Sequence, residues 1–242
     1  MPSVTAIMQA RLGSTRLPGK VLMEVNGQTF LEHAFQRLQL AESIDTAVIA
    51  TTTEPADEAI ASFCESKGWA HNRGSEADVL DRYYQTACLF PADIIVRVTS
   101  DCPLLDPTII DEVVNAVKAD FPNTSYAANV LVPRHFPRGL DVEAFTFSAL
   151  EKAWTEASKI SDREHVTPFI NTQPNIFPQK SISYPTDLSR HRWTLDTSED
   201  HELLYKILDA KPAPTSWLDI LELVESNAGW ETINAAIEQK KI

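Results

Sequence analysis

The chain has 242 residues, 43% of them hydrophobic, and a formal net charge of −13. This length can bury the core of one large domain or two modest ones, and the composition excludes a disordered chain. The acidic balance argues against a general nucleic-acid binder, because a phosphate backbone requires a basic face. A small anionic ligand needs only a local positive pocket and is not excluded.

Signals for membranes, secretion and disulfides are missing from this sequence. No segment approaches the roughly 20 apolar residues that a membrane span needs, and no signal-peptide pattern is evident. The three cysteines, Cys64, Cys88 and Cys102, are widely spaced and form no CxxC pair. Such spacing is not typical of a disulfide framework or a zinc site. We therefore expect a cytoplasmic protein with no nucleic-acid or membrane partner.

The first half of the chain alternates predicted strands and helices. Gly68 is expected to close one helix, and Pro107 to lie in the first turn of another. This order predicts an α/β fold with a largely parallel sheet covered on both faces, whose ligands lie outside the carboxyl ends of the strands. Short runs of mostly apolar residues predict strands at 3–8, 46–52, 93–99 and 124–130. Apolar residues at helical spacing predict helices at 29–40, 56–68, 77–90 and 107–121.

The alternation loosens after Val130. No internal repeat or flexible linker is evident, so we expect a single domain over 1–242 with an excursion at about 131–189 that returns to it. The expected elements of this half are a loop at 131–145 leading into a strand, a helix at 147–157, an irregular connection at 171–179, a strand end at 191–197, and helices at 198–210, 213–227 and 229–241.

The loop "QARLGSTRLPGK", residues 9–20, follows the first predicted strand. Backbone N–H groups at Gly13 and Ser14 have little steric cover, which suits a phosphate. The spacing matches neither the GxxxxGK[ST] nor the GxGxxG motif. On composition alone the loop is therefore either an anion site or a solvated surface turn. The cations that would converge on one anion are Arg11, Arg16 and Lys20.

Two aspartates follow predicted strands. Asp101 lies just after the strand at 93–99, and Asp196 lies at the strand end at 191–197. Carboxylates that meet at a polyphosphate are suitable ligands for Mg²⁺. From spacing alone, each aspartate could equally be a turn or helix-cap residue. That role fits Asp106, and the pair Thr197 and Asp200 resembles a helix-start capping pair.

The loop resembles the signature A-R-x-x-S-x-R-[LI]-P-x-K of the sugar-activating cytidylyltransferases, which include the 3-deoxy-manno-octulosonate and acylneuraminate enzymes. It is most similar to the branch of the spore coat polysaccharide biosynthesis protein SpsF. Sialate-type enzymes tend to carry D-x-D at the last metal site, whereas this chain has Thr194 two residues before Asp196. The acceptor half also matches the octulosonate enzymes poorly. Further blocks follow in the family's order at 73–85, 93–107, 137–154, 163–170 and 192–204.

The resemblance implies a Rossmann-like sheet of the nucleotide-diphospho-sugar transferase (GT-A-like) type, with the nucleotide part at about 1–130 and 190–242. It implies that a sugar hydroxyl attacks CTP in the presence of Mg²⁺, giving a CMP-sugar for surface glycans and pyrophosphate. The metal ligands would be Asp101 and Asp196. The implied catalytic residues are Arg11, Arg16, Lys20 and Asp101, and the implied nucleotide-binding residues are Ala10, Arg11, Gly13, Ser14, Arg16, Lys20, Arg73 and Ser75.

The resemblance also implies a homodimer and a sugar pocket in the excursion at 131–189. His165 could be a general base or a hydrogen-bonded packing residue, and Arg82 could be functional or pair with Asp81 on the surface. Thr51, Thr52 and Thr53 could contact the base or simply end a strand. A glycosyltransferase that uses a nucleotide-sugar and a non-catalytic pathway scaffold are the alternative functions. The sugar-binding candidates are Arg138, Asp141, Arg163 and His165.

Overall fold

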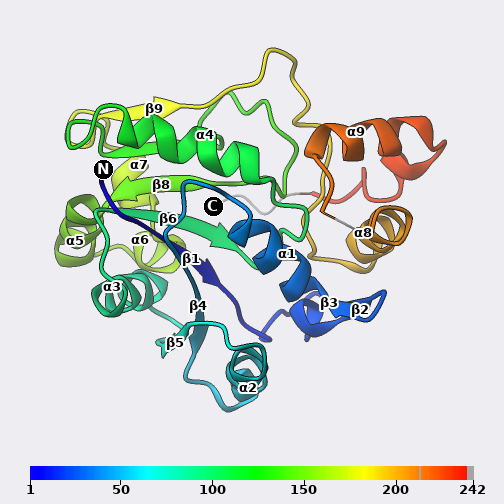
Figure 1. Ribbon diagram of the computed structural model, residues 1–242, viewed down its shortest axis with the longest axis horizontal. Helices are drawn as coiled ribbons and strands as arrows, with labels where there is room; N and C mark the ends of the chain where they lie inside the picture. The colour runs from blue at the N-terminus through cyan, green and yellow to red at the C-terminus, as the bar shows by residue number, and fades with distance from the viewer. Residues whose placement is uncertain (213, 239–242) are drawn as a thin grey trace.

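The computed structural model describes residues 1–212 and 214–238. At its centre lies a seven-stranded sheet with the order β5-β4-β1-β6-β8-β7-β9 (Figure 1). Within the described residues, β8 runs against the other six strands, since it pairs antiparallel with β6 and β7. The predicted α/β class with a mostly parallel sheet is therefore confirmed. The strands are β1 (Val4–Gln9), β4 (Thr46–Thr52), β5 (His71–Gly74), β6 (Ile94–Thr99), β7 (Tyr126–Ala128), β8 (Glu143–Thr146) and β9 (Gln179–Ser181).

Helices cover both faces of this sheet (Figure 1). Successive strand residues point to opposite faces. In β1, Val4, Ala6 and Met8 therefore pack in one hydrophobic layer while Ile7 packs in the other. The first layer contains α1 (Phe30–Gln39), α2 (Glu58–Lys67), α4 (Pro107–Lys118), α8 (Ser198–Ala210) and α9 (Trp217–Ser226), and the second is covered by α3 (Val79–Leu89), α5 (Phe147–Glu156), α6 (Ile160–His165) and α7 (Pro168–Asn171).

Several helix ends form as the sequence predicts. Gly68 ends α2 with φ of 67°, a left-handed conformation that glycine adopts at little cost. Asp106 caps the start of α4, and Pro107 is its first residue. Thr197 and Asp200 form a reciprocal capping box at the start of α8. The capping role predicted for Asp106 and Asp200 is confirmed.

The strand end predicted at 191–197 is wrong. Arg192 forms an isolated parallel bridge with Arg138, and the ladder goes no further at Gly139, whose φ is 99°. Farther on, the Leu195 N–H donates to the carbonyl of Asp101 at 2.7 Å. The segment thus forms one isolated bridge and is otherwise held by two loops instead of a neighbouring strand.

The helix predicted at 229–241 is also wrong over its described part, and residues 239–241 lie outside the described residues. Only the 3₁₀ turn η3 (Trp230–Thr232) forms there. Beyond it, the buried Asn234 side chain donates to the Arg192 carbonyl and to Asp200 Oδ1, both at 2.8 Å. Asparagine side chains that bond elsewhere compete with helical backbone pairing.

Some short elements carry no clear sequence signal. β5 is entirely polar, so no apolar alternation reveals it. The strands β2 (Glu24–Val25) and β3 (Gln28–Thr29) form a hairpin with only two residues in each strand. The strand β9 begins inside the connection that was predicted to be irregular. The turns η1 (Lys20–Leu22) and η2 (Pro55–Asp57) complete the elements named here.

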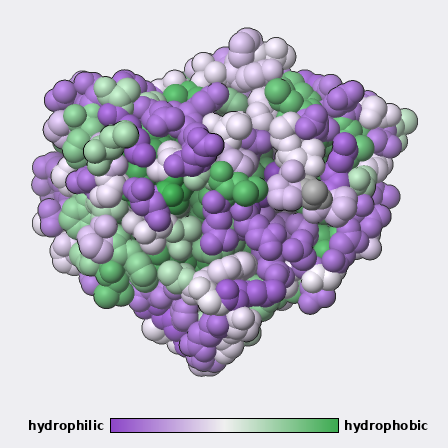
Figure 2. Space-filling model, viewed as in Figure 1, coloured by the Kyte–Doolittle hydropathy of each residue, from purple (hydrophilic) through white to green (hydrophobic). Residues whose placement is uncertain are grey.

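The surface is mostly polar, but apolar residues gather on the side where α3 lies (Figure 2). There Tyr84 of α3 stacks on Trp154 of α5 with ring centroids 4.1 Å apart, and Leu89 is exposed. The predicted homodimer stays a prediction. No helix among the described residues is long and apolar enough to cross a membrane.

Candidate functional site

A cavity of about 340 Å³ opens where β1 and β6 end. Parallel strands place the residues that follow them at one sheet edge, so the loop after β1 and the loop after β6 meet here. Eight predicted residues line it together: Ala10, Arg11, Gly13, Ser14, Arg16, Lys20, Asp101 and Asp196. The other lining residues are Gln9, Thr15, Val21, Arg82, Thr99 and Ser100.

The loop at 10–20 is held by its own backbone and by one aspartate. Asp57 accepts a hydrogen bond from the Leu12 N–H at 2.7 Å, which fixes the loop to the turn after β4. The Ser14 N–H, predicted to face a phosphate, donates to the Leu12 carbonyl at 2.7 Å. A β-carbon on Gly13 would lie 3.2 Å from Glu76 Oε1, so the absence of a side chain there permits this close approach.

Lys20 joins the two predicted metal ligands. Its Nζ donates to Asp101 Oδ2 at 3.2 Å, to Asp196 Oδ1 at 2.8 Å and to the Leu195 carbonyl at 2.6 Å. Arg16 approaches the other oxygen of Asp196 at 3.0 Å. Residues separated by more than 170 positions thus form one cluster of opposite charges, which the sequence predicts only through the resemblance.

The charges of this cluster stabilise one another. Burial by itself would lower the pKa of Lys20, but Asp101 and Asp196 outweigh it and raise this pKa above its ordinary value. Burial would likewise raise the pKa of Asp196, but Lys20, Arg16 and Arg192 outweigh it and lower this pKa. Lys20 and Asp196 are therefore both charged at neutral pH.

Arg192 is a site residue that the sequence reasoning missed. Its guanidinium bonds Asp200 through Nε at 2.9 Å and Asp196 Oδ2 through an Nη at 2.9 Å. Arg192 therefore orients the carboxylate that Lys20 contacts. Arg192 and Asp196 lie before the first residue of α8, so their four-residue spacing gives no helical signal for this contact.

Arg82 lines the cavity and is 2% exposed. It donates to the Ser75 carbonyl at 2.5 Å, while its Nε has no hydrogen-bond partner among the described residues. The alternative of a surface pair between Arg82 and Asp81 is wrong, because Asp81 accepts from Trp154 Nε1 at 2.8 Å instead. A buried guanidinium with an unused donor, facing a cavity, is suited to an anion.

Arg73 and Ser75 do not line the cavity. Arg73 Nε donates to the Thr52 carbonyl at 2.8 Å and its guanidinium pairs with Glu58, while Ser75 Oγ accepts from the Asp78 N–H at 3.0 Å. They hold β5 and the start of α3 in place beside it. None of the threonines at 51–53 lines the cavity either.

A second cavity of about 580 Å³ adjoins the first. The two share Gln9, Thr99, Asp101 and Asp196, so the two aspartates stand on their boundary. Three predicted sugar-binding residues, Arg138, Asp141 and His165, line the second cavity. Its other lining residues are Arg97, Val98, Cys102, Val130, Arg134, Gly139, Glu143, Thr167, Pro168, Asn171, Thr172 and Thr194.

Arg163, the fourth sugar-binding candidate, does not line this cavity. It forms a forked pair with Asp78, at 2.9 Å from Nε and 2.5 Å from an Nη, and thereby joins α6 to the start of α3. Two other arginines, Arg97 and Arg134, line the cavity with Arg138. Arg134, which the sequence reasoning missed, donates two hydrogen bonds to the Asp141 carboxylate, of 2.5 and 3.0 Å.

Comparison with known proteins gives close relatives over the whole chain. An uncharacterized protein of Methanocaldococcus jannaschii, MJ1063, is 37% identical over 98% of this chain and 96% of its own. The spore coat polysaccharide biosynthesis protein SpsF of Bacillus subtilis is 29% identical over 94% and 96%. A solved cytidylyltransferase from Leptospira borgpetersenii superposes with a TM-score of 0.91 at 31% identity, covering 100% of both chains.

More distant structures share the fold. A CMP:2-keto-3-deoxy-manno-octonic acid synthetase complexed with CTP matches with a TM-score of 0.64 at 16% identity, over 86% of this chain and 99% of its own. The manganese complex of Rv0371c from Mycobacterium tuberculosis matches with a TM-score of 0.57 at 14% identity, over 84% and 98%. The predicted nucleotide-diphospho-sugar transferase fold is confirmed. Because the model of the cytidylyltransferase family matches residues 5–242, this chain belongs to that family.

Proposed function

We propose that this protein uses CTP to activate a sugar, giving a CMP-sugar and pyrophosphate. The observation that carries the proposal is the meeting of two cavities at Asp101 and Asp196. One cavity is lined by cations of the family's loop, and the other is lined by arginines from the excursion. A polyphosphate in the first cavity and a hydroxyl in the second would meet at this boundary.

The first cavity would hold the triphosphate. Arg11, Arg16 and Arg82 line it with Lys20, so four cations surround a space bounded by the turn at Gly13. Fixed positive charges that face a leaving pyrophosphate stabilise the charge that develops on it. The CTP bound to a structure of the same fold supports cytidine as the base.

The two aspartates suit a hard divalent cation. Both contact one ammonium nitrogen, so a cation already fits between Asp101 Oδ2 and Asp196 Oδ1. Mg²⁺ accepts one or two carboxylates together with phosphate oxygens and water. When bound, it would supply Lewis-acid polarisation of the α-phosphate. Arg192 keeps the Asp196 carboxylate aimed at this position.

The second cavity would bind the acceptor. Arg134 and Arg138 line it, so an acidic sugar would find cations for its carboxylate. A sugar hydroxyl at the boundary would attack the α-phosphorus, so that its oxygen forms the new P–O bond as the bond to pyrophosphate breaks and its proton passes to solvent. Positioning and neutralisation of charge would supply most of the rate enhancement.

Calorimetric titration of the purified protein tests this proposal first. CTP, ATP, GTP and UTP are titrated with and without Mg²⁺, and then a panel of acidic and neutral sugars is assayed for pyrophosphate release. We expect selective CTP binding that Mg²⁺ strengthens, and we expect Asp101→Asn to lose most of this strengthening by Mg²⁺. Binding of nucleotide-sugars but of no triphosphate would instead indicate a glycosyltransferase, and binding of neither would indicate a scaffold.

A further inference from the structure

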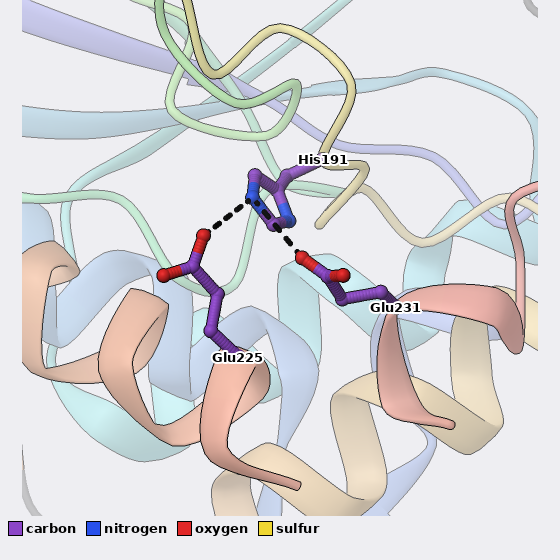
Figure 3. Close-up of side chains that lie close together, drawn as sticks. All are labelled: His191, Glu225 and Glu231. Carbon is purple, nitrogen blue, oxygen red and sulfur yellow. Dashed lines mark ion pairs between the residues drawn. The ribbon is translucent and has the colours of Figure 1, made fainter. Parts of the chain in front are cut away.

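Three side chains of the kinds that can ligate a metal ion, one histidine and two glutamates, lie close together (Figure 3). His191 lies just before Arg192, Glu225 lies in the last turn of α9, and Glu231 lies in η3. His191 Nε2 is 3.6 Å from Glu225 Oε1 and 3.6 Å from Glu231 Oε1. One ligand atom of each residue lies within 4.8 Å of the others. None of the three lines the nucleotide or acceptor cavity.

The nitrogen at the centre of this cluster lacks a hydrogen bond. The His191 side chain is 3% exposed, and Nε2 has no hydrogen-bond partner within residues 1–212 and 214–238. Its two glutamate neighbours stand just beyond hydrogen-bond distance. Buried polar atoms nearly always have a hydrogen-bond partner. A buried nitrogen that has none and that faces two carboxylates is therefore suited to binding a ligand.

We infer that His191, Glu225 and Glu231 form a binding site for a borderline divalent cation of the Zn²⁺ type. Zn²⁺ takes histidine nitrogen and carboxylate oxygen at about 2.0–2.2 Å in tetrahedral geometry, which places neighbouring ligand atoms about 3.3–3.6 Å apart. The two Nε2–Oε1 separations already match that spacing. Water would complete the coordination. Mg²⁺ prefers an all-oxygen shell and suits this site less well.

Arg190 competes for the same carboxylates. Its Nη2 lies 2.7 Å from Glu225 Oε1 and 3.7 Å from Glu231 Oε1. The Arg190 side chain is 55% exposed, so it can turn into solvent at little cost when a dication binds. This competition predicts that replacing Arg190 with a neutral residue should increase the affinity of the site for the metal.

Bound zinc would join the segment at His191 to a later part of the chain, where α9 and η3 follow one another closely. It would tie α9 and η3 to the segment that carries Arg192 and Asp196, and the His191 carbonyl already accepts from the Arg138 N–H at 3.0 Å. The ion would therefore brace the segment behind the reaction site without contacting the substrates. A ligand that binds only the folded chain raises its melting temperature.

The test uses the full chain, metal-stripped and without a polyhistidine tag. Zinc affinity is measured by competition with a chromophoric chelator, and melting temperature is recorded with and without Zn²⁺, with Mg²⁺ as the comparison ion. Glu225→Gln and Glu231→Gln should each weaken zinc binding at least about tenfold, since even supporting residues around metals are worth that much. Both glutamates are more than 40% exposed, so these variants should fold.

Two further variants complete the experiment. Glu222→Gln, an exposed change one turn earlier on α9, is the matched control and should bind zinc as the parent does. Arg190→Gln should bind zinc severalfold more tightly. Zinc-edge anomalous diffraction should place the ion on His191 Nε2. The inference is overturned if the parent binds no zinc, if both glutamine variants at 225 and 231 bind as the parent does, or if Arg190→Gln weakens binding.

Discussion

At the scale of single residues, the site depends on how its charges are paired. Asp200 is fully buried and Asp196 largely so, and Arg192 contacts both. A buried carboxylate is stable when a cation lies beside it. If the cation is removed, the desolvation of the carboxylate destabilises the fold, because no opposite charge offsets it. Arg192 should therefore contribute to the free energy of unfolding and also hold the Asp196 carboxylate in its orientation.

Arg192→Met should lower the free energy of unfolding by about 3–5 kcal/mol, because it leaves the Asp200 carboxylate without its cation. Urea denaturation followed by circular dichroism measures this loss. Arg190→Met is the matched control two residues earlier. It breaks only exposed pairs and should cost less than about 1 kcal/mol. Equal losses in the two variants would contradict this account of Arg192.

The lowered pKa of Asp196 predicts a pH dependence. Its pKa is lower in the folded chain than its ordinary value of 3.8, so the folded state binds fewer protons at this group than the unfolded state. The stabilisation by Asp196 is therefore fully present above pH 3.8 and is lost as the pH falls from there through the folded pKa.

Asp196→Asn should cost about 1–3 kcal/mol of unfolding free energy at pH 6, since charged hydrogen bonds to Lys20 and Arg192 are lost. The difference between parent and variant should shrink below pH 3.8. Urea titrations at half-unit steps from pH 6 to 3 measure it. A difference that stays constant over this range would show that the carboxylate charge is not what stabilises the fold here.

At the scale of elements, Asp106 connects two helices. One oxygen of its side chain caps α4 by accepting from the Thr108 N–H at 2.9 Å. The other accepts from the Trp217 N–H at 2.8 Å, at the start of α9. A residue that a sequence pattern identifies as a simple cap thus also satisfies a buried amide of a helix more than a hundred positions away.

Asp106→Ala should therefore cost about 2–4 kcal/mol, the sum of a lost cap and an unsatisfied buried amide. Ser216→Ala removes an exposed cap of α9, where Ser216 accepts from the Asp219 N–H, and should cost about 1 kcal/mol. Thermal and urea unfolding of both variants measure the difference. If Asp106→Ala costs no more than Ser216→Ala, the bond to Trp217 contributes nothing.

At the scale of the whole molecule, a strongly acidic chain gathers cations into one cavity. The net charge of −13 would repel nucleotides from most of the surface, whereas Arg11, Arg16, Arg82 and Lys20 line one space. That space is bounded by segments far apart in the sequence, because Asp196 lies more than 170 positions after Lys20. A ligand there should stabilise the whole fold.

Under the proposed function, CTP with Mg²⁺ at about a hundred times its Kd should raise the melting temperature by roughly 5–10 °C. Differential scanning fluorimetry measures the shift. Asp101→Asn should lose most of the part of the shift that depends on Mg²⁺, because that carboxylate is a predicted metal ligand. A shift of the same size with CTP alone and with CTP and Mg²⁺ would argue against a metal between Asp101 and Asp196.

The sequence by itself determined the α/β class, most helices and the loop at 10–20. These features depend on local causes: helical spacing, capping residues such as Asp106 and Thr197, and glycine where φ is positive. The loop motif also pointed to Lys20, and the family resemblance pointed to Asp101 and Asp196, which the fold brings together with it. Local signals failed where long-range contacts decide the outcome, as at 191–197 and 229–238, where buried side-chain and loop hydrogen bonds replace regular structure.

Only the tertiary structure decided which arginines face the cavities. Arg163 and Arg73 carry the same charge as Arg134 and Arg82, but the first two are paired with Asp78 and Glu58 outside the cavities. Long flexible side chains take the partner that packing places nearest, and a linear pattern does not contain that distance. The cluster of His191, Glu225 and Glu231 has the same origin, because folding brings His191 to the end of α9 and to η3, more than thirty positions later in the sequence.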